Sequence, residues 1–174
     1  MATMTMTERR SRTQTTPENN PRHPLAMPAT VSIEMWERFS FYGMQAILAY
    51  YLYYATTDGG LGLERAQATT LLGAYGASVY LCTLAGGWIG DRLIGTERTL
   101  LTGCIALMVG HLSLSTLSGG AGATLGLALI AIGSGFVKTA AITILGHAYP
   151  TDDPRRDAGF QLFYLGINIG AVLG

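Results

Sequence analysis

The chain has 174 residues, of which 49% are hydrophobic, only 13% are charged and 23 are glycine. This profile fits helices packed in a lipid bilayer and argues against a water-soluble domain. The 11 basic and 11 acidic residues cancel, so no charge excess points to a nucleic-acid partner.

Residues 1–24 form a segment that is rich in Thr, Arg and Pro and contains no apolar run. Such a segment cannot bury a core, so we expect a disordered tail. It also lacks the apolar stretch of a signal peptide.

The remaining residues, 25–174, contain long uncharged segments. Because about 20 helical residues cross a bilayer, we predict four full spans and the start of a fifth. Their positions are residues 30–55, 66–89, 98–117, 123–148 and 158–174. Residues 99–137 are too many for one span, and the glycine-rich sequence at 118–122 divides them. The fifth segment would be on the order of 25 Å long, which is less than a full crossing.

The arginines predict how the helices are oriented. If the N-terminus is inside, the inner segments contain eight arginines and the outer loops contain only Arg65. Cytoplasmic loops carry such an excess, so we expect the cytoplasmic membrane, with the tail in the cytoplasm. The two other basic residues, Arg38 and Lys138, lie within predicted spans.

The first span carries polar and aromatic residues along one helical stripe. Its members are Glu34, Glu37, Arg38, Phe41, Tyr42 and Gln45. A charge at the bilayer centre costs about 2.5–3.5 kcal/mol, which predicts that the stripe faces the bundle interior or a water-filled cavity. The alternative is a cytoplasmic helix end, where the glutamates favour the helix dipole and Arg38 extends to water. In the first case one carboxylate can bind a proton while the other holds the arginine.

Lys138 lies in the fourth span among apolar and small residues. A lysine at this depth needs a partner, and the only buried acids in view are Glu34 and Glu37. We therefore predict that these groups pair. The alternative is a lysine whose side chain extends to the interface.

Two further segments carry polar residues. The second span ends in the pattern G-x-x-x-D-R-x-x-G, at Gly87, Asp91, Arg92 and Gly95. This pattern resembles the inner loop of major facilitator transporters, although a glycine-rich helix end with charges in water is a simpler interpretation. In the fifth segment Gln161, Tyr164 and Asn168 share a face, which suits either a polar cavity wall or contacts between helices.

The sequence lacks motifs of catalysis or metal binding. Cys82 and Cys104 lie in apolar runs and form no CxxC or zinc pattern. No HExxH or GxSxG arrangement is present. We therefore expect neither an enzyme nor a metal or organic cofactor.

The motifs together resemble the proton-dependent oligopeptide transporter (POT) family, a branch of the major facilitator superfamily. EMWERFSFYG, at residues 34–43, is similar to the family signature ExxERFxYYG. The resemblance continues through GGWIGDR, GFVK and DAGFQLFYLGINIGA, and covers residues 25–174. The chain departs from the pattern at Phe41, at Gln45 and after Lys138, which bears on substrate preference.

The resemblance implies part of the N-terminal six-helix bundle of a major facilitator fold. It implies a symporter that imports di- and tripeptides, with the proton as coupling ion, and a C-terminal half beyond these residues. By the family pattern, Glu34, Glu37, Arg38 and Lys138 couple proton movement. The same pattern gives a peptide site lined by Tyr42, Tyr80 and Asn168, with Lys138 and Arg38.

Two alternatives remain open at this point. One is a transporter of another solute, such as nitrate or a drug-like anion. The other is a membrane sensor that carries no flux. These 174 residues alone are expected not to transport, because alternating access requires two bundles around one site.

Overall fold

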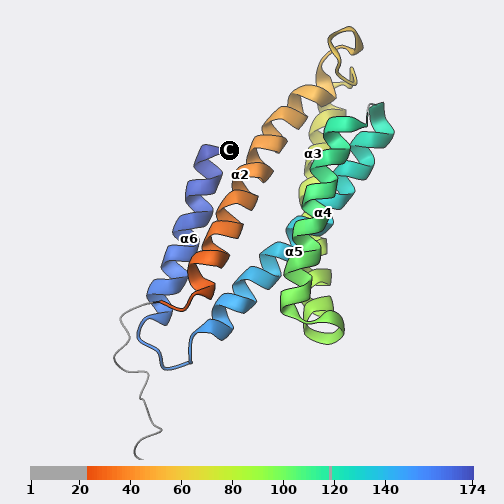
Figure 1. Ribbon diagram of the computed structural model, residues 1–174. Helices are drawn as coiled ribbons and strands as arrows, with labels where there is room; N and C mark the ends of the chain where they lie inside the picture. Colours follow the sequence, from red (N-terminus) through yellow and green to blue (C-terminus); the bar gives the residue numbers. More distant parts are fainter. Residues whose placement is uncertain (1–22, 118) are drawn as a thin grey trace, which may run out of the picture.

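A computed structural model describes residues 23–117 and 119–174, and every long element in this part of the chain is an α-helix (Figure 1). The helices are α2 (Ala26–Tyr53), α3 (Arg65–Ile89), α4 (Thr96–Thr116), α5 (Gly119–Ala148) and α6 (Arg156–Leu173). Two short elements are the 3-10 helix η2 (Thr56–Asp58) and the π-helical turn η3 (Gly90–Ile94). The all-α prediction is confirmed, while the predicted tail at 1–24 lies almost wholly outside the described residues.

The helices match the predicted spans but begin earlier. The largest differences are at α2, which begins at Ala26 where residue 30 was predicted, and at α5, which begins at Gly119 where residue 123 was predicted. Gly119 itself makes the turn, with a φ of +85° that suits glycine. The glycines that follow it are therefore helical, and the predicted divider at 118–122 is shorter than expected.

Three of the helical segments in the described part of the chain are long and apolar enough to cross a bilayer. They are Arg65–Ile94, which joins α3 to η3, and the helices Thr96–Thr116 and Gly119–Ala148. The helices α2 and α6 are not among the segments that meet these requirements of length and hydropathy. Charges at Glu34, Glu37 and Arg38 interrupt α2, and the charged residues Arg156 and Asp157 lower the mean hydropathy of α6. That α2 and α6 also enter the membrane stays a prediction.

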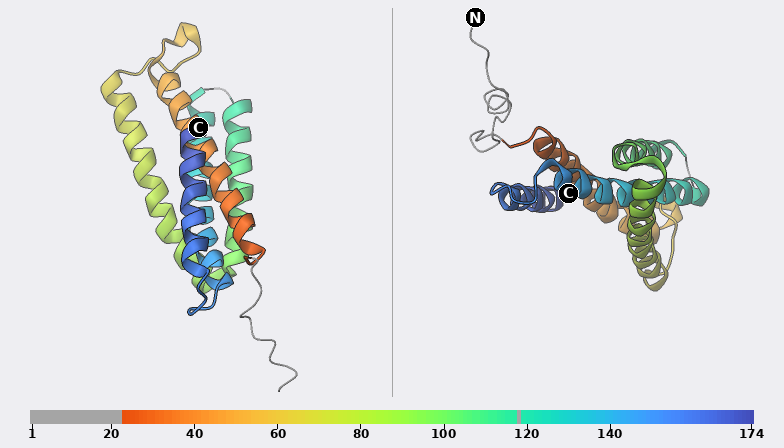
Figure 2. Two further views of the ribbon diagram at one scale, coloured as in Figure 1. Left: turned by 90° about the vertical axis from the view of Figure 1, so that its left-hand side faces the viewer. Right: turned by 90° about the horizontal axis from the view of Figure 1, so that it is seen from below.

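Helix α5 is the centre of the bundle. It crosses diagonally between α2 and α6 on the left of Figure 1 and α3 and α4 on the right, and it contacts all four. Helix α2 packs along α6, and two further views show these two helices side by side (Figure 2). A polar residue on α2 that points at α5 is therefore inside the bundle.

Glycines allow α4 and α5 to approach closely. A Cβ added at Gly110 would lie 3.0 Å from the carbonyl oxygen of Gly126, and one at Gly103 would lie 3.0 Å from that of Gly133. The two glycines of each helix are seven residues, or about two turns, apart, so they lie on the same face of that helix. Close backbone contact of this kind is how helices associate in lipid, where apolar burial offers little gain.

One connection at the end of the bundle is closed by hydrogen bonds. Between α5 and α6, Asp153 accepts bonds from the Arg155 backbone nitrogen at 2.8 Å and from its Nε at 3.0 Å. These bonds lower the pKa of Asp153 to about 2. Figure 1 shows this connection at the same end of the molecule as the start of α2 and η3.

The Gly135→Ala substitution tests the contact between α3 and α5. A methyl at Gly135 would lie 2.6 Å from the backbone nitrogen of Thr83, so the helices would have to separate. We expect a loss of about 1–3 kcal/mol, seen as a lower melting temperature of the purified protein. Gly73→Ala in α3 is the control, because a methyl there meets nothing within 4 Å. Equal melting temperatures for the two variants would contradict this packing.

Candidate functional site

The three charged residues of α2 lie in the bundle interior. Glu34 is 1% exposed, and Glu37 and Arg38 are each 6% exposed. They lie within four positions of one another, so a single face of the helix carries all three. Of the two interpretations of this stripe, the structure agrees with interior charges and not with a water-exposed helix end.

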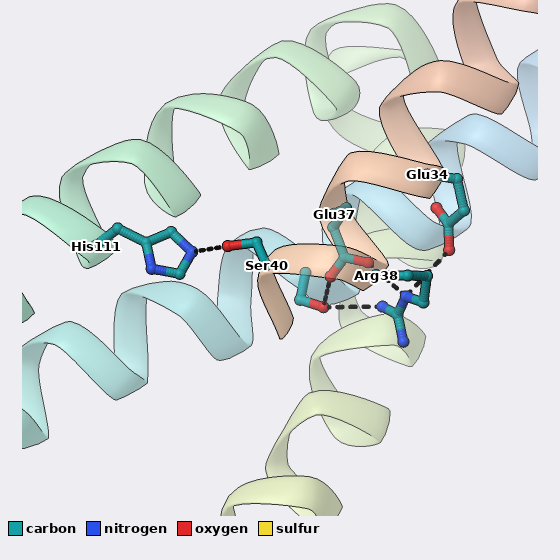
Figure 3. Close-up of polar contacts among 6 residues, drawn as sticks. Glu34, Glu37, Arg38, Ser40 and His111 are labelled. Carbon is teal, nitrogen blue, oxygen red and sulfur yellow. Dashed lines mark hydrogen bonds and ion pairs between the residues drawn. The ribbon is translucent and has the colours of Figure 1, made fainter. Parts of the chain in front are cut away.

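Arg38 lies between the two carboxylates (Figure 3). Its Nε lies 2.5 Å from Oε2 of Glu37 and 3.6 Å from Oε1 of Glu34. Its guanidinium carbon also lies 5.0 Å from the centroid of the Phe41 ring. The contact with Glu37 is thus a hydrogen-bonded ion pair, while the contact with Glu34 is only electrostatic.

A serine that the sequence interpretation missed completes this cluster. Ser134 on α5 is fully buried, donates to Oε1 of Glu37 and accepts a hydrogen bond from Nη2 of Arg38 at 3.2 Å. The available signal was its position one turn before Lys138, on the same face of the fourth span.

Glu34 is the less well satisfied carboxylate. Both of its oxygens are buried and neither has a hydrogen-bond partner among the described residues. A buried charge without hydrogen bonds is costly, and the net charge of the three-residue cluster is negative. The cluster can therefore gain a proton with little change in geometry.

Lys138 interacts with Glu34 electrostatically but forms no direct ion pair with the cluster among the described residues. Its Nζ lies 5.4 Å from the ring centroid of Tyr80 on α3, and the described residues include no ion pair between Lys138 and a carboxylate. The predicted direct pairing with Glu34 and Glu37 is therefore not formed in this structure. Arg38 is nearer to both acids because it shares their helix.

Three of the five residues assigned to peptide binding, Tyr42, Tyr80 and Asn168, are exposed and lie on different helices. Tyr42 and Tyr80 are 41% and 68% exposed, on α2 and α3. Asn168, on α6, is also exposed and donates a hydrogen bond to the backbone oxygen of Tyr164 at 2.7 Å. None of the hydrogen bonds in the described part of the chain joins these three side chains.

The inner-loop pattern forms the end of α3 and the turn η3. Gly87 faces α5, where an added Cβ would lie 3.2 Å from Cγ2 of Thr139. Asp91 and Arg92 are exposed within η3. Gly95 has a φ of +83°, which ends the turn and allows α4 to begin.

A second polar contact links α2 to α4. Ser40 Oγ and His111 Nε2 are 2.7 Å apart, on the side of α2 that also carries Glu37 (Figure 3). Both residues line a cavity of about 360 Å³ together with Glu37 and Cys104. His111 is thus a hydrogen-bonded interior residue.

The chain is similar to known peptide transporters. Residues 97–174 match the sequence model of the POT family. The chain is 46% identical over 152 residues to a di-/tripeptide transporter of Lactococcus lactis subsp. lactis (strain IL1403). The match covers 86% of this chain and 31% of that relative.

Solved structures with a similar backbone are also peptide transporters or POT family transporters. A crystal structure of the peptide transporter POT in complex with sulfate matches 87% of this chain, with a TM-score of 0.83 and 45% identity. A POT family transporter in complex with 5-aminolevulinic acid also has a TM-score of 0.83 over 87% of the chain, with 39% identity. The chain spans 31% of the length of each of these proteins. On the agreement of motifs, sequence and backbone, the chain belongs to the POT family of the major facilitator superfamily.

Proposed function

We propose that the protein is a proton-coupled symporter that imports di- and tripeptides across the cytoplasmic membrane. The observation that carries the proposal is the buried cluster of Glu34, Glu37 and Arg38 in a chain similar to di-/tripeptide transporters. Two acids around one base are expensive to keep in a membrane bundle, and such residues mark ion or substrate paths. We propose transport and no catalytic activity.

Proton binding is assigned to Glu34. Glu37 is held by Arg38 and Ser134, whereas the Glu34 carboxylate has no hydrogen bond to any residue that the structure describes. A proton on Glu34 removes the excess negative charge and leaves Arg38 with one carboxylate partner. Because peptide binding would draw on the same arginine, the affinities for proton and peptide are linked.

Peptide binding is assigned to residues around the cluster. Among the described residues no carboxylate lies within ion-pair distance of Lys138, so with Arg38 it is the cation that would receive a peptide carboxylate. Tyr80 lies beside this lysine, and Tyr42 follows Arg38 by one turn of α2. Asn168 supplies an amide from α6 that could bind the peptide backbone.

The inner-loop pattern is assigned to the conformational change. Asp91 and Arg92 are exposed on a π-helical turn, and Gly95 follows in a conformation that favours glycine. Such turns are deviations from regular helix that often accompany functional motion. Gly87 gives α3 a close contact with α5. A shift of the turn η3 would therefore also displace α5, the helix that carries Lys138.

Transport is tested with the protein expressed from its complete gene and reconstituted into liposomes that are more acidic outside. We expect a labelled dipeptide to accumulate above its external concentration, and a protonophore to abolish the accumulation. Unlabelled di- and tripeptides should compete, while nitrate should not. Uptake of nitrate alone would indicate another solute, and peptide binding without entry would indicate a sensor; either result would overturn the proposal.

The proposed orientation, with the N-terminus inside, is tested by cysteine labelling in a variant that lacks Cys82 and Cys104. Asp58, in η2, and Glu97, at the start of α4, are both exposed. The loop that follows α2 and the start of α4 lie at opposite ends of the bundle in Figure 1. A membrane-impermeant maleimide added to intact cells should label Asp58→Cys. It should label Glu97→Cys only after the cells are opened. The reverse pattern would show that the N-terminus is outside.

A further inference from the structure

We infer that Ser134 is a positioning residue of the proton-coupling cluster, which fixes Glu37 and Arg38 as a pair and leaves Glu34 to bind the proton. The inference rests on the proposed function. Ser134 is the only residue outside α2 in the described part of the chain that hydrogen-bonds this cluster. It contributes one side chain from α5 to a site that otherwise belongs to α2.

The hydroxyl group suits this position chemically. It has one hydrogen to donate and lone pairs to accept, so it can bind a carboxylate and a guanidinium at the same time. Ser134 does both, donating to Oε1 of Glu37 and accepting from Nη2 of Arg38. Alanine can do neither, and threonine can do both. The site therefore distinguishes a hydroxyl from a group that only fills space.

The backbone around Ser134 is held firmly. Gly133 packs on α4, where an added Cβ would lie 2.7 Å from the carbonyl oxygen of Gly103. Gly135 packs on α3, where an added Cβ would lie 2.6 Å from the backbone nitrogen of Thr83. Close packing on both sides leaves the segment little freedom to shift. The hydroxyl is thus presented to α2 from a fixed point.

Loss of the Ser134 hydroxyl would change the hydrogen bonds and ion pairs within the cluster. Oε1 of Glu37 would lose its donor, and Arg38 would lose the contact that turns Nη2 towards α5. Arg38 already lies 3.6 Å from Glu34 and could then be shared more equally. A carboxylate that gains the attraction of a nearby guanidinium binds a proton less readily. The expected signature is a changed pH dependence, which a merely space-filling residue would not produce.

Other titratable groups around Glu37 bear on the same measurement. They are Glu34 and Arg38 on α2, Tyr75 on α3, and Cys104 and His111 on α4, while Lys138 on α5 interacts with Glu34. Of these, the histidine ordinarily titrates near neutral pH. A His111→Gln background therefore separates its contribution from that of the cluster.

The test compares Ser134→Ala and Ser134→Thr with the wild-type protein, expressed from the complete gene and reconstituted. The pH at which dipeptide uptake is half-maximal should move downwards by about one unit in Ser134→Ala, with and without His111→Gln. Ser134→Thr should restore the wild-type profile. The control is Ser113→Ala, since Ser113 is buried on α4 and bonds only the backbone of its own helix. An unshifted profile in Ser134→Ala would overturn the inference.

A second readout does not depend on transport. The melting temperature of Ser134→Ala should fall below that of the wild type, because both hydrogen bonds of the hydroxyl group are lost, and Ser134→Thr should recover part of the loss. A melting temperature of Ser134→Ala equal to that of the wild type would show that the hydroxyl group does not hold the cluster. If Ser134→Ala does not fold, Ser134→Cys keeps the volume with a weak donor and acceptor and should give a smaller shift. Absence of wild-type uptake would refute the proposed function but leave this thermal comparison decisive for Ser134.

Discussion

Glu34→Gln is expected to abolish proton-driven accumulation of dipeptide while sparing exchange of peptide across the membrane. Glutamine keeps the shape of the side chain but cannot bind and release a proton. Each proton carried per peptide supports about tenfold accumulation per pH unit, so the variant should fall to equal concentrations on both sides. Counterflow of labelled against unlabelled peptide should continue, because Arg38 and its pair with Glu37 remain.

The comparison with Glu37→Gln separates the two carboxylates. That variant should also lose accumulation, but it removes the partner of Arg38 and of Ser134. We therefore expect a lower melting temperature for Glu37→Gln and an unchanged or higher one for Glu34→Gln, whose oxygens have no hydrogen bonds to lose. Wild-type accumulation in Glu34→Gln would refute the assignment of the proton to this residue.

Arg38→Ala is expected to have the largest effect on stability. It leaves Glu34 and Glu37 buried without a cation, and breaking a buried ion pair from one side costs about 3–5 kcal/mol. We expect little monodisperse protein in size-exclusion chromatography and a strongly reduced melting temperature. Arg98→Ala, which removes an exposed arginine, is the matched control and should behave as the wild type.

A rescue experiment shows whether the loss is electrostatic. The triple variant Arg38→Ala, Glu34→Gln and Glu37→Gln contains no charge in the cluster, so much of the lost stability should return. Transport should not return. A triple variant that is no more stable than Arg38→Ala would mean that the arginine acts by packing, for example against Phe41, and not by charge.

The positions of the helices could be predicted because charges and glycines mark where apolar segments end. The prediction for α3, residues 66–89, differs by one residue from Arg65–Ile89. The start of α5 was less accurate, because one glycine in a left-handed conformation is enough for the turn and the next glycines can be helical. The π-helical turn η3 could not be predicted, since no periodicity distinguishes five residues of π-helix from an α-helix end.

The acidic cluster could be predicted because it lies within one helix. Spacings of three and four residues place Glu34, Glu37 and Arg38 on one face whatever the other helices do. Contacts between helices depend on how each helix is rotated about its own axis relative to its neighbours. No pattern in the sequence gives this rotation directly. For this reason Ser134 was missed, and Lys138 was expected beside the acids although it lies over Tyr80.

Proton movement that is driven by peptide can be measured directly with a pH-sensitive dye trapped inside proteoliposomes. No pH gradient is imposed, and a dipeptide is added outside the wild-type protein expressed from its complete gene. If a buried carboxylate carries the proton with the peptide, the lumen should acidify as peptide enters, and Glu34→Gln should admit peptide without acidification. Peptide entry without acidification in the wild type, or equal acidification in Glu34→Gln, would contradict proton coupling through this cluster.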